Sequence, residues 1–123
     1  MWIFSKLGFF SAVESPLVPE NVIVRSRLPG DLDRLLQAMT PEERRLCGEP
    51  KIFITPDADY RYRLELRKIV FAELVRRQAE DIDYDSLENA VRGGNPIRDT
   101  AYMNVWRAMW AAQNFGEKQN KVR

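Results

Sequence analysis

The spacing of apolar residues changes between two periods along this chain of 123 residues, and this change restricts the fold more than any other feature. In residues 22–27 and 60–67 apolar and polar side chains alternate, which is the pattern of a β-strand with one wetter face. In residues 32–39 and 69–82 the apolar side chains recur at helical spacing, as in a helix that covers a sheet. The mixture predicts an α+β fold.

Turn and capping residues place the remaining elements. Residues 2–14 are predicted to be β structure, with Leu7-Gly8 as either a hairpin turn or a bulge in one long strand. Residues 51–55 and 60–67 are expected to form an antiparallel hairpin through a turn-favouring stretch that begins at Pro56. Four helix starts are expected: a cap at Asp31, a capping box from Thr40 to Glu43, a cap at Asp85 and an opening at Asn95-Pro96.

The order of these elements suits an antiparallel sheet with helices mainly on one face and the C-terminal helices appended. Ferredoxin-like layering fits best, provided that the N-terminal strand occupies the edge that a strand after the second helix usually fills. We expect one α+β domain over residues 1–115, followed by a polar, frayed tail over residues 116–123.

Charge and composition exclude several functions. Nineteen Lys and Arg against eighteen Asp and Glu give a net charge of +1, so no global field attracts DNA or an acidic membrane. The chain has no His, which removes imidazole bases and the usual zinc and iron ligand sets. The single cysteine, Cys47, allows no intrachain disulfide, and no apolar stretch is typical of a signal peptide or membrane span. We therefore expect a cytoplasmic protein without a cofactor that is more typical of a binding module than of an enzyme.

Arginines are the most informative candidate binding residues. If the alternation in residues 60–67 puts the tyrosines and leucines on one side, the other side carries Arg and Glu, and the arginines of residues 22–27 can share that face. Such a face could bind phosphates, and with Phe or Trp from the N-terminal strands it could stack single-stranded bases. The alternative is an ordinary solvated face paired with acids. The predicted binding residues are Arg25, Arg27, Arg61, Arg63 and Arg67.

An aromatic stripe marks the last helix. Tyr102, Trp106 and Trp110 follow one another at helical spacing together with Met109. Core packing is one explanation, and an interface with a protein partner or a second copy in a homodimer is the other. We expect Trp106 in the core of the monomer and Trp110 in an interface.

Two pairs of aspartates suggest an alternative to the binding module, a metal-dependent enzyme. Asp57 and Asp59, with Asp81 and Asp83, could hold a magnesium ion for chemistry on phosphate esters or nucleic acid, because Mg²⁺ accepts carboxylate oxygens without histidine. Turn formation, helix capping and solvation explain the same residues.

Five segments of the chain, taken together, resemble a widespread family of small bacterial proteins of unknown function: MWIFSKLGFFSAVE, VIVRSR, ITPDADYRYR, IDYDSLENAV and AYMNVWRAM. The resemblance covers most of the chain and implies a stand-alone bacterial cytosolic protein, without any assigned activity or functional residue. The function expected from the sequence is thus a small non-enzymatic binding or regulatory module for a protein or a single-stranded nucleic acid.

Overall fold

The computed structural model of the chain describes the backbone of residues 1–122 and the side chains of residues 1–118. Its contacts divide the chain into two compact units, Met1–Asp83 and Tyr84–Arg123. Among the described residues, every strand lies in the first unit, whereas the second unit contains only helices. The boundary expected from the sequence, after residue 115, lies inside the last helix.

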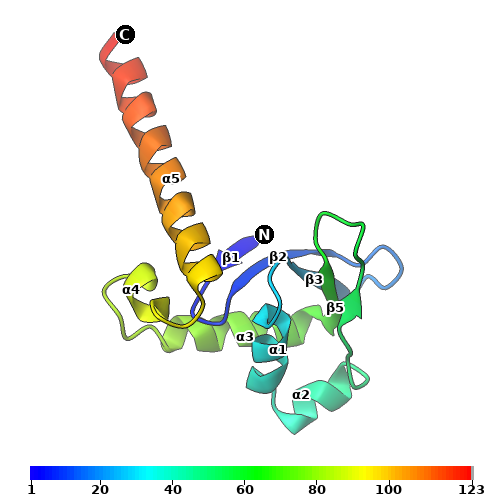
Figure 1. Ribbon diagram of the computed structural model, residues 1–123. Coiled ribbons are helices and arrows are strands. Elements are labelled where there is room, and N and C mark those ends of the chain that lie inside the picture. Colours follow the sequence, from blue (N-terminus) through cyan, green and yellow to red (C-terminus); the bar gives the residue numbers. More distant parts are fainter. Residues whose placement is uncertain (123) are drawn as a thin grey trace. The chain divides into compact units, whose positions relative to one another are not determined.

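The first unit contains a five-stranded antiparallel sheet in the order β1-β2-β3-β5-β4 (Figure 1). Its strands are β1 (Trp2–Phe4), β2 (Phe9–Glu14), β3 (Asn21–Ser26), β4 (Phe53–Ile54) and β5 (Tyr62–Arg67). For residues 2–14 the sequence allowed either a hairpin or a bulge in one long strand, and the structure shows a hairpin. Ser5 N donates to Gly8 O at 2.9 Å and Gly8 N donates to Ser5 O at 3.2 Å, which closes the turn between β1 and β2.

The strand order explains how the α+β layering is achieved. The chain runs from β3 through two helices, α1 (Asp31–Ala38) and α2 (Pro41–Leu46), to β4 and β5, and then into α3 (Lys68–Glu80). In ferredoxin-like layering a strand after the second helix would return beside the first strand. Here β2 occupies that place beside β3, and β1 extends the sheet beyond it. The expected α+β class and the rearranged edge are both confirmed.

One face of this sheet forms the hydrophobic core with α1 and α3. Figure 1 shows both helices on the same side of the strands. Alternation along β2, β3 and β5 sends every second side chain into this layer. The buried core is formed by Phe10, Ala12, Val22, Val24, Leu32, Leu35, Met39, Leu64, Leu66, Val70, Phe71 and Leu74. The strand residues that alternate with these core residues must therefore lie on the opposite face of the sheet.

Two of the four expected helix starts, those of α1 and of the helix after residue 85, have a different N-cap residue from the one predicted. The capping box is confirmed: the Thr40 side chain accepts from Glu43 N, and the Glu43 side chain accepts from Thr40 N. Asp31, however, does not cap α1, because Gly30 is the N-cap. The Asp31 carboxylate is 1% exposed and instead accepts from Phe9 N at 3.2 Å and from Arg34, so it fastens the N-terminal hairpin to α1.

The second unit consists of α4 (Leu87–Val91) and α5 (Pro96–Val122). The N-cap of α4 is Ser86 rather than the expected Asp85, and its hydroxyl accepts from Asn89 N. The opening at Asn95-Pro96 is confirmed, since the Asn95 side chain accepts from Ile97 N at 2.9 Å. Helix α5 continues past Gly116, where we had expected a frayed tail. None of the described helices combines the length and apolar character needed to cross a membrane.

Candidate nucleic-acid interface

The sheet face opposite α1 and α3, here called the open face, carries one continuous row of side chains across all five strands. Strand register pairs Trp2 with Ser11, Ser11 with Arg25, Arg25 with Arg63, and Arg63 with Phe53. Directly paired residues on neighbouring strands share a face and lie about 5 Å apart. The row therefore reads aromatic, hydroxyl, arginine, arginine, aromatic, and it spans about 19 Å at about 4.8 Å per strand.

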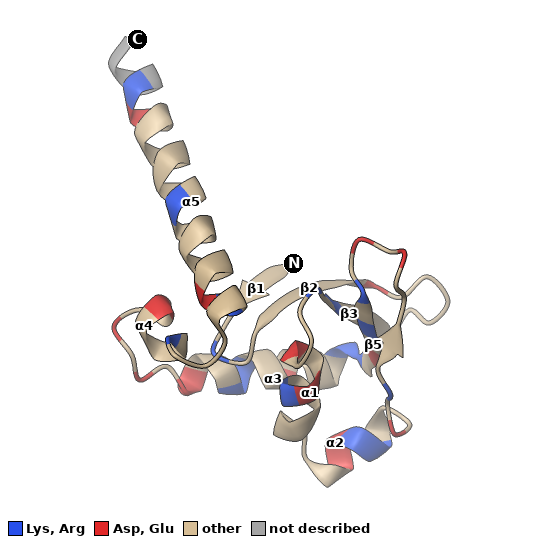
Figure 2. Cartoon of the chain, viewed as in Figure 1, with Lys and Arg blue, Asp and Glu red and all other residues tan. Residues whose placement is uncertain are grey.

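The two ends of this row are exposed, and its middle is positively charged. Trp2 is 70% exposed and Phe53 is 65% exposed, so both rings offer surface to a ligand. No residue of the row is acidic. Figure 2 shows the basic positions of β3 and β5 on neighbouring strands. The row thus combines two aromatic surfaces with two guanidinium groups between them.

Neither arginine of the row is neutralised by a close carboxylate. Arg25 donates to the Ser11 hydroxyl at 2.8 Å, and none of its contacts within the described part of the chain is an ion pair. Arg63 faces Asp59 at 3.8 Å, but that carboxylate is 68% exposed. Such a pair contributes little in water. The Nε atoms of Arg25 and Arg63 are buried and have no hydrogen-bond partner among the described residues.

Tyr60 organises the arginines at one end of the open face. The guanidinium carbons of Arg25 and Arg27 lie 4.3 and 4.4 Å from the centre of its ring. The ring is also 6.4 Å from that of Phe9. Tyr60 is 4% exposed, which desolvates these cation–π contacts and strengthens them. The sequence pattern grouped Tyr60 with Tyr62 and the leucines on one side of the strand. The structure separates Tyr60 from the core cluster, because β5 begins at Tyr62 and its alternation does not extend to Tyr60.

The N-terminal hairpin adds aromatic surface next to this cluster. Phe4 and Phe9 are paired across β1 and β2, and their rings stack with centroids 4.4 Å apart. Trp2 meets the Phe9 ring edge-on at 5.9 Å. The expectation that the N-terminal strands provide Phe or Trp beside the arginines agrees with this arrangement.

The other two predicted arginines lie outside the row. Arg67 pairs with Asn21 at the far end of β5, and its side chain donates to Leu46 O at 3.3 Å. Arg61 precedes β5, so strand register assigns it to neither face, and its backbone carbonyl accepts from Thr55. Of the five predicted arginines, the structure therefore brings Arg25, Arg27 and Arg63 together.

The strands of the open face carry one acidic residue beside the arginines, Glu65, and its carboxylate is hydrogen-bonded to neutral groups. Glu65 pairs with Ile23 in the row next to the arginines. Its carboxylate accepts from Asn21 at 2.8 Å and from the Ser15 hydroxyl at 3.3 Å. This carboxylate therefore accepts from neutral donors, and none of its contacts among the described residues is an ion pair with Arg25 or Arg63.

The predicted carboxylate site for magnesium is not assembled. Among the described residues no three acidic or cysteine side chains gather in a way that could hold a metal ion. Asp57 and Asp59 lie in the turn before β5, whereas Asp81 and Asp83 follow α3. Asp83 pairs with Lys6 at 3.1 Å, and Asp59 accepts from Tyr60 N at 2.9 Å. Local turn and ion-pair roles explain both pairs.

The aromatic stripe of α5 is only partly buried. Tyr102 is 5% exposed, so it is not part of an open surface. Trp106 is 50% exposed, and our expectation that it lies in the core of the monomer is wrong. Helical spacing places side chains on one stripe, but it does not say how far along the helix that stripe is covered. Trp110 is 55% exposed, in agreement with a surface position.

The thiol of Cys47 has no activating environment. It lies at the C-cap of α2, and its sulfur accepts from Arg67 N at 3.5 Å. Burial raises the pKa of the Cys47 thiol above its ordinary value, despite the opposing effect of Arg67. The thiolate is the reactive form, so this cysteine has no features of a nucleophile.

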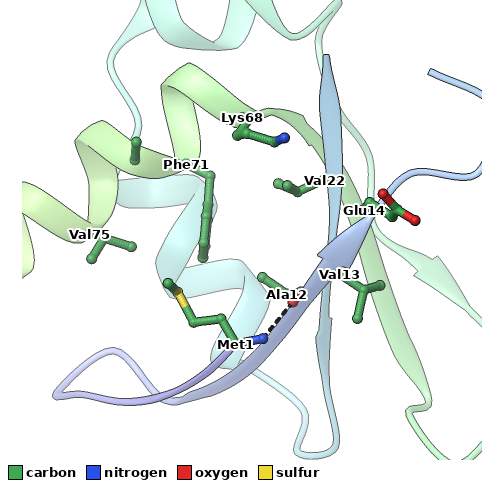
Figure 3. A pocket seen from close by; sticks show the side chains of 9 residues that line it. Met1, Ala12, Val13, Glu14, Val22, Lys68, Phe71 and Val75 are labelled. Carbon is green, nitrogen blue, oxygen red and sulfur yellow. Dashed lines mark hydrogen bonds between the residues drawn. The ribbon is translucent and has the colours of Figure 1, made fainter. Parts of the chain in front are cut away.

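A pocket of about 430 Å³ lies on the other side of the sheet, between β2 and α3 (Figure 3). Its walls are apolar and include Ala12, Val22, Phe71 and Val75. Lys68 and Glu14 are the charged side chains of its lining. No sequence pattern indicated this pocket, because it depends on how α3 packs against β2.

Comparisons of the chain with protein-family models, with curated proteins and with solved structures find no match. The case for a function therefore depends on the geometry of the open face. Three of its residues were not singled out from the sequence, namely Ser11, Phe53 and Tyr60. Alternation in residues 51–55 could have indicated Phe53, but only the strand register shows that it shares a row with Arg63.

Proposed function

We propose that this protein is a binding module for single-stranded nucleic acid, with the open face as its binding surface. The observation that carries the proposal is the row from Trp2 through Arg25 and Arg63 to Phe53. Exposed aromatic rings stack on bases, and arginines bind phosphates through two donors at once. A row with an aromatic at each end and arginines between them matches a short strand laid across the sheet.

The low net charge of the chain is compatible with this proposal. Nonspecific binding to duplex DNA depends on many phosphate contacts over a broad basic surface. A single strand can instead be held by base stacking and a few phosphate contacts, since stacking contributes about 1–3 kcal/mol per base. We therefore expect binding of modest affinity that prefers single strands to duplexes. The proposal also places the protein in the cytoplasm, where a lone thiol such as Cys47 stays reduced.

Fluorescence anisotropy with a labelled oligonucleotide of about ten nucleotides at low ionic strength tests the proposal. Trp2→Ala and Arg63→Ala should each weaken binding by about tenfold, because each removes a base or phosphate contact of roughly 1.4 kcal/mol or more. Arg61→Ala should have a smaller effect than Arg63→Ala, since Arg61 precedes β5. Unfolding free energies should change little for these exposed or half-buried positions.

Arg76→Ala is the matched control. It removes the same charge from α3, which packs against the other face of the sheet, and its side chain is 52% exposed. This variant should bind as the wild type does, and the salt dependence of Arg63→Ala should be shallower by about 0.7 in the logarithmic slope. Absence of wild-type binding at low salt, or equal losses for Arg63→Ala and Arg76→Ala, would refute the proposal. If a duplex competitor bound with the same affinity as the single strand, binding would be due to charge alone and base stacking would have no part in it.

A further inference from the structure

Helix α5, in the second unit, carries an exposed apolar patch. The patch consists of Trp106, Met109 and Trp110, which are 50%, 65% and 55% exposed. Positions separated by three and four residues lie on one side of a helix. The rings of Trp106 and Trp110 are stacked, with centroids 6.2 Å apart and planes within 6° of parallel. The three side chains therefore form one continuous ridge rather than scattered exposed residues.

The charge distribution around this ridge favours a partner with the same surface. Between Asp99 and Glu117 the only charged residue is Arg107, the single blue segment in the middle of α5 in Figure 2. At about 100° per residue, Arg107 lies about 100° around the helix from Trp106 and therefore beside the ridge. A partner recognised by charge would need complementary charges in the patch. An uncharged apolar ridge can meet an identical ridge across a two-fold axis without bringing like charges together.

The exposed tryptophan rings supply about half of the area that a specific symmetric interface needs. A whole Trp side chain offers about 250 Å², so two half-exposed rings leave about 250 Å² uncovered in each copy. Two copies together would bury about 500 Å² from these rings alone, which is half of the about 1,000 Å² of a specific interface. Met109 and the flanking side chains of a helix about 40 Å long can supply the remainder.

We propose that α5 pairs with α5 of a second copy of this chain through Trp106, Met109 and Trp110. The resulting homodimer has an isologous interface in which the same ridge is contributed by both copies. The inference does not depend on the proposed nucleic-acid function.

Light scattering coupled to size exclusion, over low to high micromolar concentrations of the full chain, tests this inference. The wild type should shift from monomer to dimer as its concentration rises. The double variant Trp106→Ala/Trp110→Ala should stay monomeric over the same range. Phe115→Ala is the matched control, because Phe115 is 64% exposed and lies about 180° around α5 from Trp106. It should dimerise as the wild type does.

Tryptophan fluorescence of the unmodified protein gives a second measurement that does not depend on the variants folding. Dilution should move the emission to longer wavelength as the ridge becomes solvated. A wild type that remains monomeric at high micromolar concentration, with emission independent of concentration, would overturn the inference. A double variant that still dimerises would show that another surface forms the dimer and would equally overturn it.

Discussion

Glu43 gives the sharpest test of how the first unit is held together, because its carboxylate joins α2 to α3. Arg77 donates to this carboxylate from both terminal nitrogens, at 2.7 and 2.9 Å, and Thr40 N donates at 2.9 Å. These bonds, Arg77 first, lower the pKa of Glu43 from 4.5 to about 2, against the opposing effect of burial. At about 1.4 kcal/mol per pKa unit, this corresponds to about 3 kcal/mol of stability.

We expect Glu43→Gln to lower the free energy of unfolding by about 2 kcal/mol near pH 7, since the Arg77 side chain is 29% exposed and solvent screens part of the interaction. The folded state favours the ionised carboxylate, so the unfolded chain binds more protons between the two pKa values. The stabilisation is therefore complete above about pH 5.5 and is lost as the pH falls through about 2. Less than half of it should remain at about pH 3.

Urea unfolding of the wild type and the variant at both pH values measures this difference. Glu42→Gln is the matched control, because Glu42 is exposed in the same first turn of α2. It should cost only a few tenths of a kcal/mol through the helix dipole. The reasoning fails if Glu43→Gln is no more destabilising than Glu42→Gln, or if its effect is the same at both pH values.

Two further predictions follow from the first unit. Gly8→Ala should lower stability by about 2 kcal/mol or more, because a Cβ there would lie 2.4 Å from Cγ of the buried Asp31 and Gly8 has φ +154°. Gly48→Ala, at φ +69° with nothing within 4 Å, should cost about 1 kcal/mol from backbone strain alone, and thermal melts that rank the two in the opposite order would contradict this. Cys47 should react with iodoacetamide at mildly alkaline pH more slowly than a free thiol, because burial raises its pKa. Mass spectrometry follows the reaction, and a rate equal to that of a model thiol would contradict this prediction.

Local sequence patterns identified the kind of element in most segments of the chain. Period-two alternation identified β3 and β5, and helical spacing identified α1 and α3. These signals are local, since they depend on side chains a few residues apart. The capping box at Thr40 and the helix start at Asn95-Pro96 were found for the same reason. Alternation also predicted that Arg25 and Arg63 leave the core face of their strands.

Tertiary structure decided how these elements meet, and most of the candidate site depends on it. The row from Trp2 to Phe53 exists only through the register of four strand pairs, which alternation within one strand does not specify. Asp31 reads as a helix cap, but its partner Phe9 lies 22 positions away.

The same limit explains the aromatic residues that the sequence misplaced. Alternation grouped Tyr60 with Tyr62 and the leucines, but the strand starts two positions later and the Tyr60 ring contacts Arg25 and Arg27. Helical spacing put Tyr102 and Trp106 on one stripe, yet one is buried and the other half exposed. The contacts of Tyr60 join residues that are more than thirty positions apart in the chain, and a local pattern holds no information about their geometry.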